Sequence, residues 1–365
     1  MESNSYLLID TAALASNVRA IREDLHGAVL VGVIKGNAYG LGAVPVAREL
    51  MKLGVEEFAV SHAAEGLELR RAGIGCPIMV MSLPLDFQLE AAAAADLTLT
   101  LGSFRQFETF RAVSQKLGGP LTVQLKLDTG LHRIGFVPGE LEEAAAKMKE
   151  YAPFLRCVGT FSHFADTVPE HMDAQLALFL EMIGELNAAG IDTGLRHISS
   201  SASLEASPKY NLDAVRVGRR LYMDNPDAPD GRIRECASFR AYLTDVRQRR
   251  AGESLAYGNG FHLKNDAVVG VLSIGYGDGL PTELAKVGAP VLVNGKTAHL
   301  LAECMDQSFV DVTGVDCAPG DEVTLFGYDG RGGFLSSQYV AGLIGGNEGC
   351  GLTDALGPRV ERIYI

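Results

Sequence analysis

The sequence predicts an α/β protein, a closed (β/α)8 barrel of the TIM type followed by a smaller β-rich domain. In the first two thirds of the chain, short β-rich runs alternate with stretches that carry apolar residues at three- and four-residue spacing, the pattern of amphipathic helices. From about residue 238 the β-rich runs are separated by turn residues instead of helical stretches. We therefore expect a barrel domain over residues 1–237 and a mainly β domain over residues 238–365.

The first domain is expected to be a barrel because of the number and alternation of its elements. Strands that alternate with helices indicate parallel pairing through crossover helices. Eight such units within about 200 residues favour a closed barrel over an open doubly wound sheet. The expected strands are Val29–Lys35, Glu57–Ser61, Ile78–Ser82, Leu97–Gly102, Leu121–Asp128, Val158–Phe164, Leu195–Ser200 and Ala214–Gly218. The expected helices include Ala43–Leu53, Ala64–Ala72, Ser103–Leu117, Glu140–Tyr151 and Met172–Ala189.

The last third of the chain has the pattern of a mainly antiparallel sheet. Its runs are punctuated by turn pairs such as Asn294-Gly295 and Pro319-Gly320. The expected strands are Phe239–Val246, Ala267–Ile274, Ala289–Val293, Phe309–Val312 and Glu322–Phe326.

The charge balance and the cysteine pattern exclude several classes of protein. Of the 365 residues, 45 are acidic and 32 basic, a net charge of −13 without a basic cluster, which argues against binding nucleic acid or an anionic membrane surface. No apolar run approaches the roughly 20 residues that span a bilayer, and the first residues lack the features of a signal peptide. The six cysteines are scattered without a C-x-x-C pair. We therefore expect reduced thiols, no metal site and a cytoplasmic enzyme.

Polar side chains follow the carboxyl ends of five expected strands, which in a barrel face one mouth. A single lysine or histidine at such a place would most simply be a solvated or structural group. Five polar strand ends at one mouth predict an active site. These strand ends carry Lys35, Lys126 with Asp128, His163, Ser199–Ser201, and Arg216 with Gly218.

Two features of these strand ends point to a cofactor. Serines after the seventh strand and a glycine after the eighth occupy the place where barrels often bind phosphate through hydroxyl and backbone N–H groups. A lysine at the end of a buried strand can form a Schiff base with a carbonyl group. A lysine imine beside a phosphate site is typical of pyridoxal 5′-phosphate (PLP), although sugar-phosphate lyases fit the same pattern.

Six motifs together resemble the alanine racemase family. They occur in the order found in that family, and with the C-terminal segment Pro358–Ile365 the resemblance covers nearly the whole chain. The family fold is a (β/α)8 barrel with a β-rich C-terminal domain, in agreement with the strand count. The motifs are Val33-Ile-Lys-Gly-Asn-Ala-Tyr-Gly-Leu-Gly42, Lys126-Leu-Asp-Thr-Gly-Leu-His-Arg-Ile-Gly135, Ser162-His-Phe164, Arg216-Val-Gly218, Ile274-Gly-Tyr-Gly-Asp-Gly279 and Cys304-Met-Asp-Gln307.

The resemblance implies a PLP site in the barrel. Lys35 would hold PLP as a Schiff base, Arg216 would face the pyridine nitrogen, and Arg133 would bind the phenolic oxygen. His163 would lie beside the ring, and Lys126 matches a lysine that is often carbamylated in this family and orients Arg133. The groups expected around the phosphate are the side chains of Tyr39 and Ser201 and the backbone N–H groups of Gly218 and Arg219.

The resemblance also implies a two-base racemase that works as a homodimer. Racemisation removes a proton from one face of the substrate Cα and returns one to the other, so Lys35 would serve one face and Tyr276 the other. Tyr276 and Met305 would enter the site from the partner subunit, and Arg133 and Met305 would contact the substrate. Arg216 cannot accept a proton, so the ring nitrogen would stay neutral and transamination would be disfavoured.

One position departs from the family pattern. Near the C-terminus, alanine racemases usually carry Tyr-Glu where this sequence has Asn347-Glu348. The asparagine opens space beside the substrate Cβ and offers an amide to a serine hydroxyl, so we expect serine as well as alanine to be racemised. With its glycine-rich flank, the segment resembles the racemase domain of the membrane-bound serine/alanine racemases of vancomycin resistance, which supply D-Ser for modified peptidoglycan precursors. The chain would then be cytoplasmic without membrane contact of its own, either alone or as the cytoplasmic domain of a membrane-anchored protein.

Other functions stay open on the sequence alone. The first alternative is an ordinary biosynthetic alanine racemase that supplies D-Ala. A barrel-type PLP decarboxylase of basic amino acids is more distant, since that family places an acidic residue against the ring nitrogen, where this chain has Arg216. A non-enzymatic PLP carrier is usually a single domain, whereas two are expected here.

Overall fold

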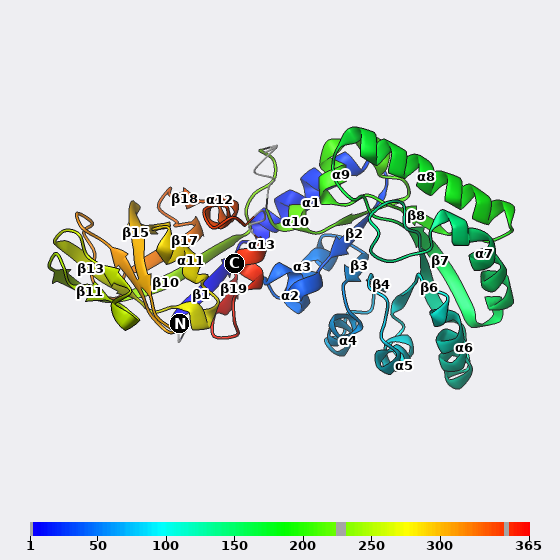
Figure 1. Ribbon diagram of the computed structural model, residues 1–365, viewed down its shortest axis with the longest axis horizontal. Coiled ribbons are helices and arrows are strands. Elements are labelled where there is room, and N and C mark those ends of the chain that lie inside the picture. Colours follow the sequence, from blue (N-terminus) through cyan, green and yellow to red (C-terminus); the bar gives the residue numbers. More distant parts are fainter. Residues whose placement is uncertain (1–2, 224–230, 347–349) are drawn as a thin grey trace. The chain divides into compact units, whose positions relative to one another are not determined.

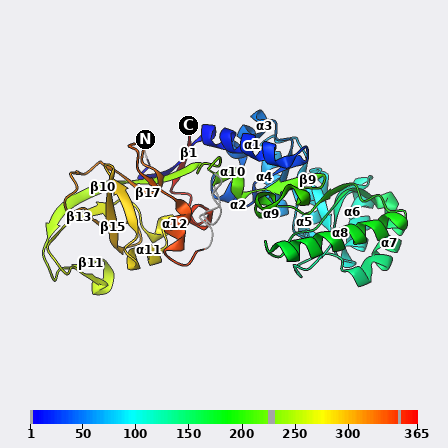
Figure 2. The ribbon, with the colours of Figure 1, turned by 90° about the horizontal axis from the view of Figure 1, so that it is seen from above.

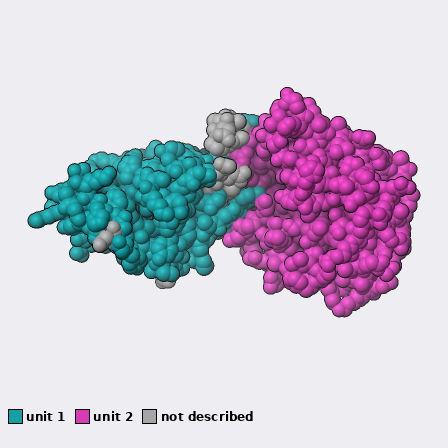
Figure 3. Space-filling view, in the orientation of Figure 1, with its two compact units in different colours: residues 1–17, 39–42, 222–365 teal, residues 18–38, 43–221 magenta. Residues whose placement is uncertain are grey.

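The computed structural model describes residues 3–223, 231–346 and 350–365 (Figure 1). These residues form two compact units, coloured separately in Figure 3. Residues 18–38 and 43–221 form the first, called here the barrel unit; residues 1–17, 39–42 and 222–365 form the second, the β unit. The first 17 residues and residues 222–237 thus group with the β unit, and the domain limits 1–237 and 238–365 stay a prediction.

The barrel unit, all of whose residues are described, contains eight parallel strands, as predicted. Their order around the sheet is β8-β7-β6-β5-β4-β3-β2-β9. A bridge between Ser200 and Arg216 and the bond from Arg216 N to Ser199 O close the sheet between β8 and β9. The strands are β2 (Val29–Val33), β3 (Glu57–Val60), β4 (Ile78–Val80), β5 (Thr98–Leu101), β6 (Leu121–Lys126), β7 (Leu155–Phe161), β8 (Leu195–His197) and β9 (Ala214–Val217).

Helices connect successive strands and lie outside them, as Figure 1 shows for α4 to α8. In α3, the buried residues Ala43, Val46, Ala47 and Leu50 recur at the spacing of one helical face. Among the described residues, no helix has both the length and the apolar character that a bilayer span requires. The helices before and within the barrel are α1 (Thr11–Leu25), α3 (Ala43–Lys52), α4 (Ala63–Arg71), α5 (Asp86–Ala94), α6 (Arg105–Leu117), α7 (Leu141–Glu150), α8 (Pro169–Ala188), α9 (Ser201–Ala206) and α10 (Arg219–Tyr222).

The β unit contains a mainly antiparallel sheet, as predicted, and Figure 2 shows β10, β13, β15 and β17 within it. Among the described residues the strand order is β18-β17-β14-β15-β16-β13-β10-β1-β19, with a further pairing of β17 and β10. The strands are β1 (Ser5–Ile9), β10 (Ala237–Arg249), β13 (Ala267–Leu272), β14 (Pro290–Val293), β15 (Lys296–Glu303), β16 (Ser308–Asp311), β17 (Glu322–Tyr328), β18 (Phe334–Leu335) and β19 (Glu361–Tyr364), with β11 (Ser254–Leu255) and β12 (Phe261–His262) as a separate pair. Its helices are α11 (Thr282–Lys286), α12 (Ser337–Gly342) and α13 (Cys350–Asp354).

Strand β1 was not predicted from the sequence. It pairs antiparallel with β10 and parallel with β19, so both its partners lie more than 200 residues away along the chain. A single five-residue apolar run carries no local signal of such long-range pairing. The sheet of the β unit therefore includes both ends of the described chain.

Candidate active site

The predicted polar residues meet at one mouth of the barrel, because the carboxyl ends of parallel strands point the same way. Lys126 ends β6, His163 follows β7, Arg216 lies in β9, and Lys35 follows β2. Burial, and then the charges of Arg216, Arg133, Lys126 and Lys35, lower the pKa of His163 to about 3. One neutral imidazole thus lies among four basic side chains, in a chain whose net charge is −13.

Arg216 is the centre of the hydrogen bonding at this mouth. Its side chain is buried and donates to the Nδ1 atoms of His197 (2.6 Å) and His163 (3.0 Å). It also donates to the carbonyl oxygens of Ser162 (2.8 Å), Ile198 (3.2 Å) and His197 (3.4 Å). Burial, and secondarily the charge of Arg133, lowers the pKa of Arg216 to about 9, so it is a cation at neutral pH. All of its hydrogen-bond acceptors in the barrel unit are imidazoles or carbonyls, so its charge is not neutralised by a carboxylate.

The bonds from Arg216 show which ring nitrogen of His163 and of His197 carries the proton. A guanidinium has only donors, so each Nδ1 must be an unprotonated acceptor. His197 is fully buried, and burial together with Arg216 and Lys126 lowers its pKa well below the usual value. Its other nitrogen, Nε2, lies 2.5 Å from Gln124 Oε1 and carries the proton of the neutral ring. His163 and His197 are therefore both neutral, with the proton on Nε2.

Lys126 is buried between charged neighbours. Its Nζ donates to Leu127 O (2.5 Å) and lies 5.5 Å from the centre of the Phe161 ring. Burial is the largest cause that lowers the pKa of Lys126 to about 7; Arg216 and Arg133 add to it and Asp128 opposes it. Near neutral pH a large share of this amine is unprotonated, the form that reacts with CO2.

The Asp128 carboxylate stabilises the loop that follows Lys126 through hydrogen bonds to its backbone. Its Oδ1 accepts from the backbone N–H groups of Gly130 (3.0 Å) and His132 (3.1 Å). Burial opposes ionisation, but these bonds and the charge of Lys126 hold the pKa of Asp128 below its usual value. The turn places Arg133 at the mouth with an exposed side chain. No hydrogen bond joins Lys126 to Arg133 in the barrel unit, so their predicted contact is not made by the unmodified amine.

Two of the predicted phosphate-binding groups, Ser201 and Gly218, lie together in the barrel unit. Ser201 begins α9, and its Oγ accepts from the backbone N–H groups of Gly218 (3.2 Å) and Arg220 (3.4 Å). The Arg219 side chain is engaged elsewhere, in a two-point ion pair with Glu205 (2.7 and 2.8 Å). The ion pair engages Nη2 of Arg219, and the predicted role of the Arg219 backbone N–H stays a prediction.

Lys35 stands at the start of an unusual turn. The labelled helix α2 (Lys35–Tyr39) is not right-handed, since φ is 59° at Gly36, 55° at Asn37, and 54° at Ala38 and Tyr39. A left-handed conformation costs about 1–2 kcal/mol per non-glycine residue. It is supported by bonds from Gly36 N to Glu65 Oε1 (2.6 Å) and from Ala43 N to Asn37 Oδ1 (2.8 Å). The turn ends the strand at Val33 instead of the predicted Lys35 and leaves the Lys35 side chain exposed.

Tyr39 is assigned to the β unit, where its ring lies 5.4 Å from that of Tyr222. Asn347 lies outside the described residues, so its predicted role has no structural counterpart here.

Tyr276 and Met305 lie together on the β unit. Tyr276 N donates to Cys304 O (3.2 Å), and Gly277 N donates to Met305 O (2.8 Å). At Gly275 a Cβ would come within 2.1 Å of Cys304 O, so only glycine allows this approach. Both side chains are exposed, Tyr276 at 45% and Met305 at 50%. The backbone therefore holds the tyrosine in place while its ring faces outward.

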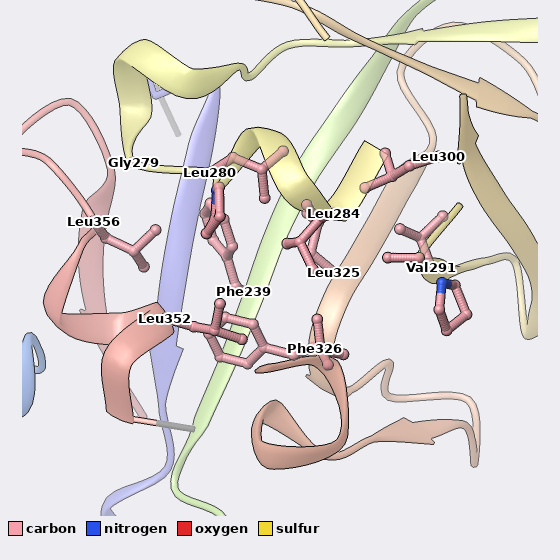
Figure 4. Close-up of a pocket in the computed structure, with 14 residues that line it drawn as sticks. Phe239, Gly279, Leu280, Leu284, Val291, Leu300, Leu325, Phe326, Leu352 and Leu356 are labelled. Carbon is pink, nitrogen blue, oxygen red and sulfur yellow. The ribbon is translucent and has the colours of Figure 1, made fainter. Parts of the chain in front are cut away.

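The residues that follow this turn pack into the apolar interior of the β unit. Figure 4 shows Leu280, Phe239 and Leu352 lying close together next to Gly279. The cavity among them is about 10 Å³, which is room for about one water molecule. The pocket is a well-filled core that anchors the Tyr276 turn, and it is too small to be a ligand site.

Two residues of the Arg216 network were not among the predicted site residues, His197 and Gln124. Gln124 and Lys126 lie two positions apart on β6, so both share one side of the strand. Polar residues at period two on a strand that is otherwise buried are the signal that could have identified Gln124. His197 lies at the end of β8, and its bond to Arg216 in β9 depends on the closure of the barrel, which leaves no local signal in the sequence.

Comparisons with known proteins agree along the whole chain. The model of the alanine racemase N-terminal domain matches residues 9–226, and that of the alanine racemase C-terminal domain matches residues 236–364. An alanine racemase from Streptomyces coelicolor is 34% identical over 98% of this chain and 95% of its own length. The structure of an alanine racemase from D-cycloserine-producing Streptomyces lavendulae superposes with a TM-score of 0.92 at 30% identity, covering 100% of this chain and 98% of that one. An alanine racemase from Bacillus anthracis with bound L-Ala-P gives a TM-score of 0.92 at 28% identity, covering 100% and 96%. Members of this family are PLP-dependent isomerases, and the chain described here belongs to the alanine racemase family.

Proposed function

We propose that this protein is a PLP-dependent racemase that interconverts L- and D-alanine with two bases on opposite faces of the substrate. The observation that carries the proposal is the cluster of basic side chains around the neutral His163, with the Arg216 guanidinium bonded directly to its Nδ1. PLP and an amino-acid substrate both bring negative charge, as phosphate, phenolate and carboxylate. A buried positive mouth on an acidic protein is complementary to that pair of ligands.

The donor groups of the barrel mouth fit PLP. The Ser201 hydroxyl and the backbone N–H of Gly218, with the N–H of Arg219 and the Tyr39 phenol, would hold the phosphate. Arg216 would present an N–H to the ring nitrogen. Of the other residues, Lys35 would form the Schiff base, Arg133 would bind the phenolic oxygen and His163 would lie beside the ring.

When bound, PLP supplies an electron sink that makes the substrate Cα–H acidic. The chain's own residues then handle the proton. The Lys35 amine would take or give it on one face and the Tyr276 phenol on the other. Arg216 has only N–H donors and cannot accept a proton, so it leaves the ring nitrogen unprotonated. This limits charge delocalisation and so favours return of the proton to Cα.

Exchange of the Cα hydrogen in D2O tests this function. With L-alanine, the protein loaded with PLP should give both enantiomers with deuterium at Cα. Loss of CO2, or binding of PLP without exchange, would contradict the proposal.

The proposal includes a homodimer in which Tyr276 and Met305 complete the partner's site. Their outward-facing side chains on a backbone-held turn support it. Mixing inactive Lys35→Ala and Tyr276→Phe chains should restore activity, because a mixed dimer has one site with both lesions and one with neither. With random exchange about a quarter of all sites would be intact. No recovery after proven subunit exchange would contradict the shared site.

A second proposal concerns the substrate range. Asn347, at a position where the family usually carries tyrosine, supports acceptance of serine, and with it the supply of D-Ser for modified peptidoglycan precursors as in vancomycin resistance. The relatives reported above are named alanine racemase, which supports the biosynthetic D-Ala role better. The ratio of kcat/KM for L-Ser and L-Ala in wild type and Asn347→Tyr decides between them. An unchanged ratio would remove Asn347 as a determinant of specificity.

A further inference from the structure

We propose that Gln124 is a positioning residue, which holds His197 in the tautomer that accepts a hydrogen bond from Arg216. Through His197, Gln124 would fix the guanidinium that faces the cofactor. The cofactor part of this inference rests on the proposed function; the link between Gln124, His197 and Arg216 does not.

The direction of the hydrogen-bond chain follows from its donors. Arg216 Nη1 can only donate, so His197 Nδ1, 2.6 Å away, must accept. The proton of the neutral ring is then on Nε2, and Gln124 Oε1 accepts it. If the Gln124 amide were reversed, its NH2 would face Nε2 and the ring proton would move to Nδ1. Two donors would then face each other at 2.6 Å, and Arg216 would lose its closest acceptor.

His197 cannot easily become charged, so the remaining question is which nitrogen of its neutral ring carries the proton. Its ring is fully buried and stacks on Phe161 at 5.3 Å with an angle of 8° between the planes. A protonated imidazole would put a second positive charge against the Arg216 guanidinium. The position of the proton on the neutral ring is therefore set by the two partners of the ring, the donor Arg216 at Nδ1 and the acceptor Gln124 at Nε2.

Gln124, at the other end of this hydrogen-bond chain, faces a pocket at the opposite mouth of the barrel. Gln124, itself 6% exposed, lines a pocket of about 320 Å³ formed by residues at or near the starts of strands, among them Glu57, Thr98, Thr122 and Arg156. No residue of the barrel unit accepts a bond from the Gln124 amide nitrogen, so within this unit His197 is the only hydrogen-bond partner of the Gln124 side chain. Position 124 therefore reaches the predicted cofactor site through His197 only.

The fold makes specific room for this side chain. At Gly159 on the neighbouring strand β7, a Cβ would lie 3.2 Å from Gln124 Cδ and 2.7 Å from Leu195 O. Any larger residue there would press on Gln124 where it meets His197. The absence of a side chain at position 159 thus fits the need to keep Oε1 on Nε2.

Three variants separate positioning from a merely structural role. Gln124→Met has a similar volume but no acceptor, so it leaves the His197 Nε2–H unpaired. Gln124→Glu keeps an oxygen at the same place and should act as the conservative rescue. Thr98→Val is the matched control, because Thr98 lines the same pocket, is equally buried and has no side-chain hydrogen bond in the barrel unit.

The first measurement is the tautomer itself, by ¹⁵N NMR of the histidine rings in the full chain without substrate. The His197 signals are identified by their loss in a His197→Gln variant. Wild type, Gln124→Glu and Thr98→Val should carry the proton on Nε2, whereas Gln124→Met, in which only Arg216 still favours that tautomer, should show a larger population protonated on Nδ1 than wild type. A wild-type proton on Nδ1 overturns the proposal, whether or not any variant folds.

The second measurement is made on the PLP-loaded enzyme. Gln124→Met should lower kcat about tenfold or more, as expected for a lost hydrogen bond, with KM changed less than about twofold. The absorption band of bound PLP should shift in the same variant, and Gln124→Glu should return both values close to wild type. Wild-type kcat and spectrum in Gln124→Met, or equal changes in Thr98→Val, overturn the proposal. Failure of the wild type to racemise would instead contradict the proposed function and leave the tautomer measurement decisive for this inference.

Discussion

The barrel mouth and the Tyr276 turn hold their polar residues in opposite ways. At the barrel mouth, Arg216 and His197 are almost completely buried and are fixed by bonds between side chains. On the β unit, the Tyr276 and Met305 side chains are about half exposed, and only the backbone of their segments is fixed. The first arrangement builds a rigid electrostatic environment; the second places one functional group on a surface.

The difference indicates which part of the proposed two-base site one chain could complete by itself. A network that tunes charge must exclude water, so it belongs in a core. A proton donor that works on a ligand held elsewhere needs a defined position and an uncovered end. The predictions below test this division, starting with the substitution expected to have the largest effect.

Lys35→Ala should abolish racemisation, with a loss of about 10⁴-fold or more, because in the proposed mechanism one residue is both the attachment point of PLP and a base. Since the Lys35 side chain is exposed, the melting temperature without PLP should hardly change. Activity and the absorption spectrum of bound PLP measure the first effect, and calorimetry the second. Activity within tenfold of wild type would remove Lys35 from the mechanism.

Tyr276→Phe should lower kcat by about 10²–10⁴-fold, the usual contribution of a positioned acid or base. PLP should remain bound, since its predicted ligands lie in the barrel unit apart from Tyr39. Exchange of the Cα hydrogen should become much slower from one enantiomer than from the other. Near wild-type rates in both directions would show that Tyr276 is only a turn residue.

Lys126, in the barrel mouth, should make the free energy of unfolding depend on pH. Its folded pKa of about 7 lies below the value near 10.5 of an unfolded lysine, so the unfolded chain binds more protons between these values. Stability should therefore rise with pH across that window, by at most about 1.4 kcal/mol per pH unit. Lys126→Met should lack this slope in CO2-free buffer. With ¹³CO2, wild type should show a carbamate signal that the variant does not; equal slopes and no signal would contradict both expectations.

Much of the barrel mouth could be predicted because its signals are local. Each strand end carries its polar residue within a few positions of an apolar run, and parallel topology then brings the ends together. Pairings across long sequence separations left no such signal. Strand β1 depends on partners at Ala237–Arg249 and Glu361–Tyr364, and the bond between His197 and Gln124 spans 73 positions. The left-handed turn after Lys35 was missed because Asn37, Ala38 and Tyr39 are not glycines, which are the usual marker of positive φ.

The smallest expected effect concerns Arg359, which braces the Tyr276 turn from outside. Its guanidinium contacts Asp278 of the turn (3.0 Å) and Asp306 beside Met305 (2.7 Å), but it is half exposed. Ion pairs with an exposed partner contribute little, and although Asp278 is buried, it keeps its bond from Gly275 N, and the backbone bonds at Tyr276 and Gly277 remain without Arg359.

Arg359→Gln should therefore lower kcat less than about fivefold and leave KM and the melting temperature nearly unchanged. Arg249→Gln, which removes another exposed pair of the β unit, is the matched control and should change none of them. If Arg359→Gln instead approached the loss seen in Tyr276→Phe, the turn would be held by side chains after all. The contrast with the barrel mouth would then be wrong, because both parts of the site would depend on a charged network for their geometry.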